Sequence, residues 1–405
     1  MQSEINNQAS VKPNLAGWLE TVFHTTAHFS NDFFLAFFVP TLPVLITRLG
    51  LLKVHVGILI LGLELTALSM PIIGHIADKK DIRKFMVLTP AVTALCMSVL
   101  TLVPNFWMLF LILVFGGVSA YFYHAIGPAD IGRVAERALG RVMAIWNNAG
   151  QVGFMLGPLV ITAILTSQAT ARIPYLVLVG FMLSFFLFIV WRKIPNGGIP
   201  FITAEQQQHK LDTAGRKRIL RQFLPIIGIS VTLSLVRSSA YAYLPVYIVE
   251  RGGSLWMSGM AVSFYFGAGM LGNYIGGALY DRIGTKWVTA ISLLGFILTF
   301  CTAIFTAGYT QLFLIAVMGM LGFMLMPTLM AMLQKNNPED RSLTNGLFLG
   351  LTYSITALGS VVTGYMLDHM PTQSVFLINA AIGLTSLGFV PLLVDRFKPI
   401  YQKVK

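Results

Sequence analysis

Twelve stretches of mostly apolar residues, each long enough to cross a lipid bilayer, follow one another along the chain. A helix needs about 20 such residues to span the hydrocarbon core. Only 11% of the residues are charged, whereas soluble proteins carry about 25%. We therefore predict an all-α polytopic membrane protein with 12 transmembrane helices, at 18–46, 55–76, 85–103, 107–127, 141–166, 173–192, 222–249, 257–279, 287–306, 310–333, 342–366 and 373–394.

The basic residues predict the orientation of these helices. With the N-terminus placed in the cytoplasm, 23 of the 28 Lys and Arg residues fall in cytoplasmic segments, as the positive-inside rule requires. We therefore expect both termini in the cytoplasm and the chain in the cytoplasmic (inner) membrane. The net charge of +12 follows from this topology, so it needs no nucleic-acid partner.

A polar segment at 193–221 divides the twelve spans into six and six. It contains Pro195, Gly197, Gly198 and Pro200 and is then rich in basic residues. We predict an N-terminal six-helix bundle at 1–192, a cytoplasmic linker at 193–221 that attracts anionic lipids, and a C-terminal six-helix bundle at 222–405.

Neither the first residues of the chain nor its cysteines change the predicted fold. The polar first twelve residues lack the layout of a cleaved signal, so the first span is expected to act as an uncleaved anchor. Cys96 and Cys301 lie in apolar runs and form neither a disulfide framework nor a metal pattern.

The two halves repeat a short loop motif. Gly74-His-Ile-Ala-Asp78, with Arg83 nearby, follows the second span, and Gly277-Ala-Leu-Tyr-Asp281 follows the eighth, 203 residues later. Because six spans separate the copies, both halves have the same orientation. Parallel repeats of this kind place a substrate site near the midplane, between the halves.

This loop motif and the 6+6 arrangement look like the major facilitator superfamily, and the resemblance covers essentially the whole chain. Within it, His28-x-x-Asn31-Asp32 and Tyr123-His124 resemble the fosmidomycin-resistance group of drug exporters. The resemblance implies that the loops latch a cytoplasmic gate by switching ion pairs; the alternative is that they only fix topology. The gating residues predicted in this way are Gly74, Asp78, Arg83, Gly277, Asp281, Arg282, Gly284 and Lys286.

The fifth span carries Gly150, Gly153, Gly157 and Pro158. Small residues at this spacing let helices approach closely, and a proline bends a helix. The pattern resembles the fifth-span motif associated with antiporters in the superfamily, which favours export. The alternative is ordinary helix packing.

A ladder of titratable residues runs through the first span at a spacing of four: Glu20, His24, His28 and Asp32. Asp32 lies about 21 Å along the helix, at 1.5 Å per residue, and is therefore deep in the membrane. Burial penalises the charged carboxylate, and histidine titrates near neutral pH. We predict that Asp32 and His28 carry the coupling proton; the alternative is a structural cluster with Asn31. Glu20 and His24 are expected to lie at the hydrated interface without a functional role.

Two further titratable groups are predicted to take part in proton coupling. Glu64 is deep in the second span, where either a proton or Arg237 can neutralise it. His124 lies in the cytoplasmic third of the fourth span, beside Tyr121 and Tyr123.

Arg237 is the only Lys or Arg in the interior of a span; Arg141 and Arg192 stand at the cytoplasmic ends of theirs. Its planar guanidinium suits carboxylates or phosphates, and Tyr241 follows one turn later. A single cation among aromatic residues indicates an amphipathic organic substrate. The alternative is an ion pair with Asp32 or Glu64. The predicted substrate-binding residues are Arg237, Asn31, Tyr241, Tyr123, Asn147 and Gln151.

We therefore predict a secondary active transporter that exports a small amphipathic compound or drug in exchange for protons, by alternating access. It is expected to be a monomer whose partners are substrate, protons and lipid. No P-loop of the form G-x-x-x-x-G-K-[ST] is present, so direct ATP drive is not expected. Scattered histidines and the lack of a G-x-S-x-G elbow argue against an enzyme, and no cofactor is expected.

Two other transport functions remain open. The first is a proton symporter that imports a nutrient or a siderophore-like metabolite. The second is a divalent-cation transporter that uses the ladder as its metal site, because imidazole and carboxylate ligands suit transition metals. On a straight helix, however, the four members rotate away from one another.

Overall fold

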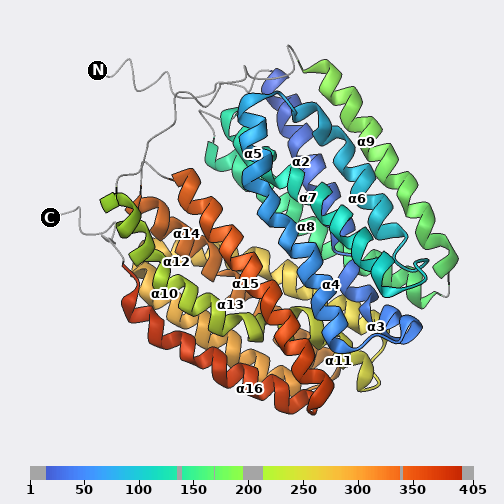
Figure 1. Cartoon of the computed structure of the whole chain (residues 1–405), viewed down its shortest axis with the longest axis vertical. Coiled ribbons are helices and arrows are strands. Elements are labelled where there is room, and N and C mark those ends of the chain that lie inside the picture. Colours follow the sequence, from blue (N-terminus) through green and yellow to red (C-terminus); the bar gives the residue numbers. More distant parts are fainter. Residues whose placement is uncertain (1–14, 135–138, 168, 195–212, 338–340, 395–405) are drawn as a thin grey trace.

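The computed structural model describes residues 15–134, 139–167, 169–194, 213–337 and 341–394, and every described element is helical. The first half of the chain forms α2–α9 and the second half forms α10–α16, and Figure 1 shows the two groups side by side. Side chains on the outer faces, such as Phe181, Phe185 and Trp107, are exposed and apolar. A lipid-facing surface explains this, because acyl chains replace water as the solvent.

The helices of the first half are α2 (Leu15–Leu35), α3 (Phe38–Leu49), α4 (Lys53–Leu65), α5 (Met70–Lys79), α6 (Thr89–Ser98), α7 (Phe106–Val134), α8 (Leu139–Thr166) and α9 (Leu176–Lys193). Short 3₁₀ segments lie at Thr66–Ser69, Arg83–Leu88 and Thr170–Tyr175. The helices of the second half are α10 (Thr213–Ser238), α11 (Leu244–Glu250), α12 (Leu255–Ile304), α13 (Gly308–Phe323), α14 (Leu325–Asn336), α15 (Arg341–His369) and α16 (Thr372–Leu384). A π-helical segment at Ser239–Tyr243 and a 3₁₀ segment at Thr385–Leu392 complete the described elements.

Ten helical stretches of the described chain are long and apolar enough to cross a membrane. One of them, α12, contains two predicted spans, separated at Gly284, where φ is 79°. The predicted span 85–103 is divided between the 3₁₀ segment Arg83–Leu88 and α6, so it yields no single long helix. The described residues thus contain all twelve predicted spans.

Several spans are interrupted where proline removes a backbone donor. The first span divides into α2 and α3 at Ala36 and Phe37, just before Pro40, whereas Pro43 lies inside α3 without ending it. In the seventh span, the π-helical segment separates α10 from α11, which has Pro245 in its first turn. Arg237 lies just before this segment. Such π segments are frequent at functional sites because they re-aim the side chains beside them.

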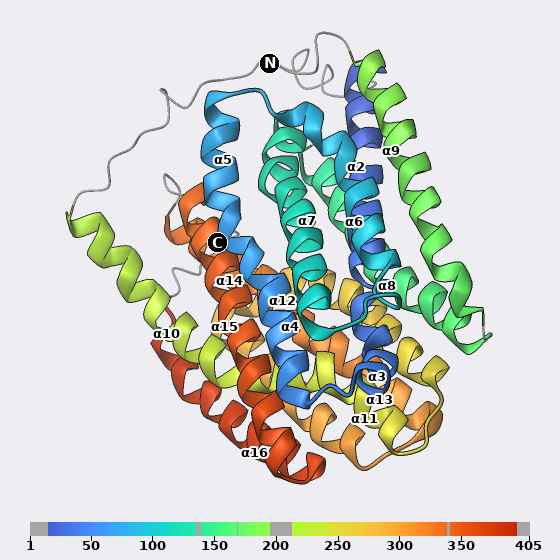
Figure 2. The same ribbon diagram turned by 45° about the vertical axis from the view of Figure 1, so that its right-hand side comes forward.

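The halves meet mainly through α4 against α15 and α8 against α12. Figure 2 shows the lower ends of α4 and α15 beside α3 and α11, while the upper ends of α5 and α10 diverge. The described part of the predicted linker is partly helical: α10 begins at Thr213 and carries Lys217, Arg218 and Arg221. The remainder, 195–212, lies outside the described residues.

Candidate functional site

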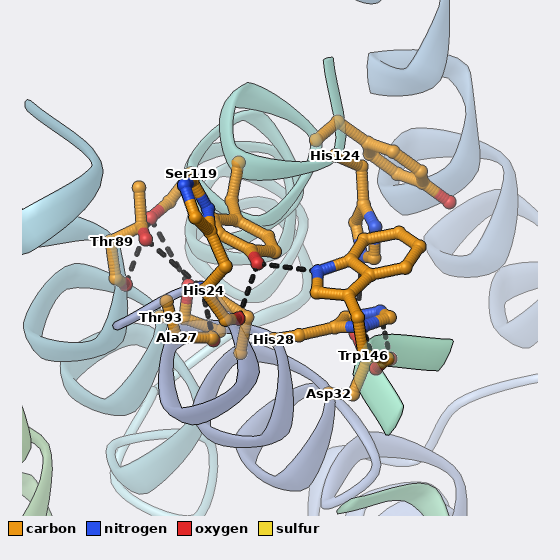
Figure 3. A network of polar contacts seen from close by, with 12 residues as sticks. His24, Ala27, His28, Asp32, Thr89, Thr93, Ser119, His124 and Trp146 are labelled. Atoms are coloured by element: carbon orange, nitrogen blue, oxygen red, sulfur yellow. Dashed lines mark hydrogen bonds and ion pairs between the residues drawn. The ribbon is translucent and has the colours of Figure 1, made fainter. Parts of the chain in front are cut away.

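Asp32, His28 and His124 come together in the core of the first half (Figure 3). His28 and Asp32 lie one turn apart on α2, and His124 comes from α7. His28 Nε2 lies 3.2 Å from Asp32 Oδ2, and His124 Nε2 lies 3.1 Å from Asp32 Oδ1. Asp32 and His28 are each 4% exposed, so the carboxylate is held between two imidazoles with almost no access to solvent.

Trp146, which sequence reasoning missed, fixes the orientation of His28. Its backbone carbonyl oxygen lies 2.8 Å from His28 Nδ1, and its ring stacks on the imidazole at 4.1 Å. A carbonyl oxygen can only accept a hydrogen bond, so Nδ1 carries a hydrogen. Trp146 is the only tryptophan of its span, but a contact made by a backbone carbonyl has no signature in sequence.

The hydrogen on His28 Nδ1 determines which form of Nε2 faces Asp32. With a hydrogen on Nδ1, a neutral His28 presents the lone pair of Nε2 to a carboxylate oxygen 3.2 Å away. Two acceptors at that distance repel unless a proton lies between them. The buried pair therefore requires one shared proton, either as imidazolium with carboxylate or as imidazole with carboxylic acid.

Glycines on α8 bring its backbone against this pair. A Cβ at Gly150 would lie 2.4 Å from Asp32 Oδ2 and 2.5 Å from His28 Nε2. At Gly153 and Gly157 it would meet backbone atoms of Phe29 and Phe33 at 2.7 and 2.3 Å. Pro158, also inside α8, has its carbonyl bonded by the Thr162 hydroxyl at 2.6 Å. The spacing of small residues thus sets the contact between α2 and α8.

Glu64 is half-buried and accepts a 2.5 Å hydrogen bond from the Tyr121 hydroxyl. The Tyr121 ring also contacts Tyr353 of α15, with centroids 6.3 Å apart. Glu64 therefore lies where the two halves meet, and among the described residues its partner is a phenol. An ion pair of Arg237 with Glu64 or Asp32, the predicted alternative, is not formed between these described side chains.

Two predicted substrate-binding residues have their polar groups engaged inside the first half. Asn31 is fully buried; its amide donates to Ala27 O and Thr89 Oγ1 and accepts from Thr93 Oγ1, each at 2.9 Å. Tyr123 is also fully buried. Neither side chain faces an open space in this structure, because each joins α2 to a neighbouring helix.

The Tyr123 hydroxyl links His24 of the ladder to Trp146, the residue that stacks on His28. It donates to His24 O at 2.5 Å and accepts from Trp146 Nε1 at 2.7 Å. Figure 3 labels His24 and Trp146, the two residues that this hydroxyl joins.

The prediction that Glu20 and His24 lie at the hydrated interface is wrong. Glu20 is 7% and His24 is 2% exposed, and His24 Nε2 lies 3.4 Å from Asp130 Oδ2. Asp130, on α7, also lies 3.4 Å from Arg83. Burial here results from α7 and α9 covering this end of α2. The four residues of the ladder do not converge on one metal site. His24 faces Asp130, whereas His28 and Asp32 face each other and His124.

In the first loop motif, Arg83 forms an ion pair with Asp81. Arg83 Nη2 and Nε each lie 2.9 Å from an Asp81 oxygen, and this hydrogen bonding holds the pKa of the Asp81 carboxyl below its usual range. Arg83 is buried while Asp81 is largely exposed. The side chain of Asp78, the predicted partner, lies outside what the structure describes.

Gly74 and Gly277, two of the predicted gating residues, do not pack closely against the described residues. A Cβ at either position would meet nothing within 4 Å.

The charged residues at the start of the second loop motif are exposed to solvent. Asp281 and Arg282 are exposed and form no ion pair with another described residue. Gly284 adopts the positive φ that separates two spans, and Lys286 Nζ donates to Pro391 O at 2.8 Å.

Arg237 lines a small recess of about 10 Å³ in the second half, whose described walls include Ser230, Phe348 and Thr352 and no acidic side chain. Tyr265 and Tyr353 lie near enough to interact with its charge. Tyr241 lines a second small recess, also of about 10 Å³, together with Tyr265. Neither tyrosine near Arg237 was singled out from the sequence, because nothing in their spacing relates them to it.

The polar residues of α8 lie at the boundary with α12. Asn147 is exposed, and its neighbour Asn148 donates a hydrogen bond to the Tyr274 hydroxyl of α12. Gln151 has a buried Oε1 without a partner among the described groups. A buried acceptor of this kind is available to a ligand or a water.

Comparison with known proteins places the chain in a family. A family model described as Major Facilitator Superfamily matches residues 25–272 and 257–403. The Fosmidomycin resistance protein of Escherichia coli strain K12 is 24% identical over 396 residues, which cover 92% of each chain. YfnC of Bacillus subtilis strain 168, an uncharacterized MFS-type transporter, is 23% identical over 384 residues, 90% of this chain and 88% of that protein.

Solved structures share the fold. The nucleoside transporter NupG superposes with a TM-score of 0.71 at 15% identity, over 94% of this chain and all of that one. A bacterial homolog of the human lysosomal transporter Spinster, inward-facing and unoccupied, gives 0.69 at 14% identity, over 94% and 95%. The predicted resemblance and the predicted fold class are both confirmed.

Proposed function

The chain belongs to the major facilitator superfamily, and on that premise we propose that it exports a small amphipathic organic compound in exchange for protons. The observation that carries the proposal is the His28–Asp32 pair. Because Trp146 O engages His28 Nδ1, the facing atoms of the pair need one proton between them. A buried group that must hold a proton in one state and can release it in another is what proton coupling requires.

Release of this proton changes the packing beside it. Without the proton, Asp32 Oδ2 and His28 Nε2 repel each other, and the backbone of α8 at Gly150 leaves them no room to separate in place. Relief then requires movement of α2 relative to α8, which itself packs on α12 of the other half. His124, which is half-buried, offers the proton a way out of the pair.

In the proposed cycle the Asp32 group takes up a proton from outside, the halves rock about the central site, and the proton leaves to the cytoplasm as substrate is loaded. Arg83, Asp281, Arg282 and Lys286 act at the cytoplasmic gate. Export rather than import is supported by the glycine motif of α8 and by the E. coli relative, whose name refers to resistance.

Arg237 is proposed to bind an acidic group of the substrate. Among the described residues its recess is lined by two hydroxyls, one aromatic ring and no carboxylate, so the arginine has a charge to offer to an anion. Tyr241 and Gln151 are proposed to contact the rest of the substrate.

Replacing Arg237 by Gln is expected to weaken transport of acidic substrates by about tenfold or more, since a lost charge-assisted hydrogen bond is worth about 1.5–3 kcal/mol. Arg237→Lys keeps the charge but not the fork, so it should retain part of the activity. KM would be measured for matched acidic and neutral compounds. Equal losses for both compounds would contradict an anion site.

The proposal is tested by overexpression and deletion, followed by screens for drug susceptibility and exported metabolites. Compounds found in this way would be assayed in everted vesicles, where an exporter dissipates an imposed proton gradient when substrate is added. Substrate accumulation in right-side-out vesicles driven by an inward proton gradient would instead establish a symporter.

A further inference from the structure

The first turn of α4 is capped by a side chain from the other half of the molecule. Asp368, near the end of α15, accepts hydrogen bonds from the backbone N–H of Lys53 at 2.7 Å and of Val54 at 2.9 Å, one on each oxygen. The first N–H groups of a helix have no partner within it and carry partial positive charge. Leu52, the N-cap residue, supplies no side-chain hydrogen bond.

Further contacts gather at the same place. The Tyr243 hydroxyl, from the π-helical segment, lies 2.8 Å from Ser360 O and 3.1 Å from Lys53 O. Lys53 Nζ forms an ion pair with Glu250 of α11. This end of α4 is therefore bound to three elements of the second half, α11, α15 and the π-helical segment.

Glycines bring the two backbones close enough for these bonds. A Cβ at Gly57 would lie 2.5 Å from Ser360 O, and one at Gly364 would lie 2.4 Å from Lys53 O. The two backbones therefore pack in direct contact beside this cap, and Lys53, Val54 and Asp368 are each partly buried.

We propose that Asp368 is a latch that holds the two halves together at the end of the molecule predicted to face outside. Opening that end for substrate release requires Asp368 to leave Lys53 and Val54, so the strength of this cap sets how often the outer end opens. The inference rests on the proposed alternating-access function. The Lys53–Glu250 pair contributes less, because Glu250 is 42% exposed and exposed ion pairs are weak.

The experiment uses Asp368→Asn in the full-length protein. Asn keeps the size of the side chain but replaces one oxygen with an NH₂ group, which then faces a backbone N–H donor. The reporter is S360C, because Ser360 is 2% exposed within the contact between α4 and α15. Its alkylation by a membrane-impermeant maleimide is followed by peptide mass spectrometry in intact cells, without added substrate.

Asp368→Asn is expected to raise the labelling rate of S360C by about tenfold, which corresponds to about 1.4 kcal/mol. Glu250→Gln, which removes the neighbouring exposed acid, should leave the rate within about twofold. Asp368→Ala should give at least the effect of Asp368→Asn. Native Cys96, buried inside the first half, reports unfolding and should stay unlabelled throughout.

Equal S360C labelling in the parent and in both Asp368 variants would overturn the latch. A parallel rise at Cys96 would also contradict it, because the substitutions would then loosen the whole fold. Labelling requires neither a proton gradient nor a substrate, so its outcome is separate from any failure of the proposed proton-coupled export.

Discussion

Replacing Asp32 by Asn is expected to abolish transport driven by a proton gradient while sparing exchange of substrate for substrate. The Asn side chain can donate a hydrogen bond from its NH₂ group to His28 Nε2, which satisfies the 3.2 Å contact without a proton. The site then has no proton to gain or lose. The halves can still alternate, because the packing of α2 against α8 keeps its volume.

Two assays in reconstituted vesicles separate these effects. Gradient-driven substrate movement should fall to the level of empty vesicles, whereas counterflow of labelled substrate should remain comparable to that of the parent protein. Glu250→Gln, which removes an exposed carboxylate, should be normal in both assays. Undiminished gradient-driven transport by Asp32→Asn would refute the coupling role.

The fold could be predicted because long apolar runs have few alternatives in a bilayer. Each predicted span reappears, and the discrepancies are local. Gly284 breaks α12 by its positive φ, and the third predicted span changes from 3₁₀ to α-helix at Leu88–Thr89. Hydropathy does not register such changes, because they alter the hydrogen-bonding pattern and leave the composition unchanged.

The site was predictable where its members share a helix. His28 and Asp32 are one turn apart, so their contact follows from the period of α2. His124 was identified only through a family resemblance, since no local pattern connects α7 to α2. Trp146 acts through a backbone carbonyl and Gly150 through the absence of a side chain, so neither role is visible in residue type alone.

Burial was the least predictable property. Depth along the first span suggested that His24 lies in water, but α7 brings Asp130 against it. The role of Asp368 could not be predicted for the same reason, because it depends on packing between distant helices. Asp368 precedes His369 and Met370 at the end of a span and resembles an ordinary residue of the membrane interface. Its partner is a helix N-terminus 314 residues away in sequence, and only the packing of the two halves brings them together.

Replacing Gly150 by Ala is expected to lower thermal stability and also to change the pH dependence of transport. The added Cβ would lie 2.4 Å from Asp32 Oδ2 and 2.5 Å from His28 Nε2, so either the helices or the proton-sharing pair must move apart. Overpacking of this kind costs about 1–3 kcal/mol, which should appear as a lower Tm in detergent. A longer distance between His28 and Asp32 weakens their hold on the shared proton, so the acidic limb of the transport profile should shift.

Two glycine variants separate packing from proton binding. Gly153→Ala disturbs the same helix contact, because its Cβ would meet Phe29 O at 2.7 Å and the backbone carbon of Asp32 at 3.2 Å, but its three nearest atoms include no side-chain atom of the proton-sharing pair. It should lower Tm without moving the pH profile. Gly277→Ala has nothing within 4 Å and gains about 1 kcal/mol of helix propensity, so its Tm should stay the same or rise. If Gly150→Ala and Gly153→Ala gave the same pH profile, the role of Gly150 would be packing alone. The position of α8 would then be independent of the proton on Asp32.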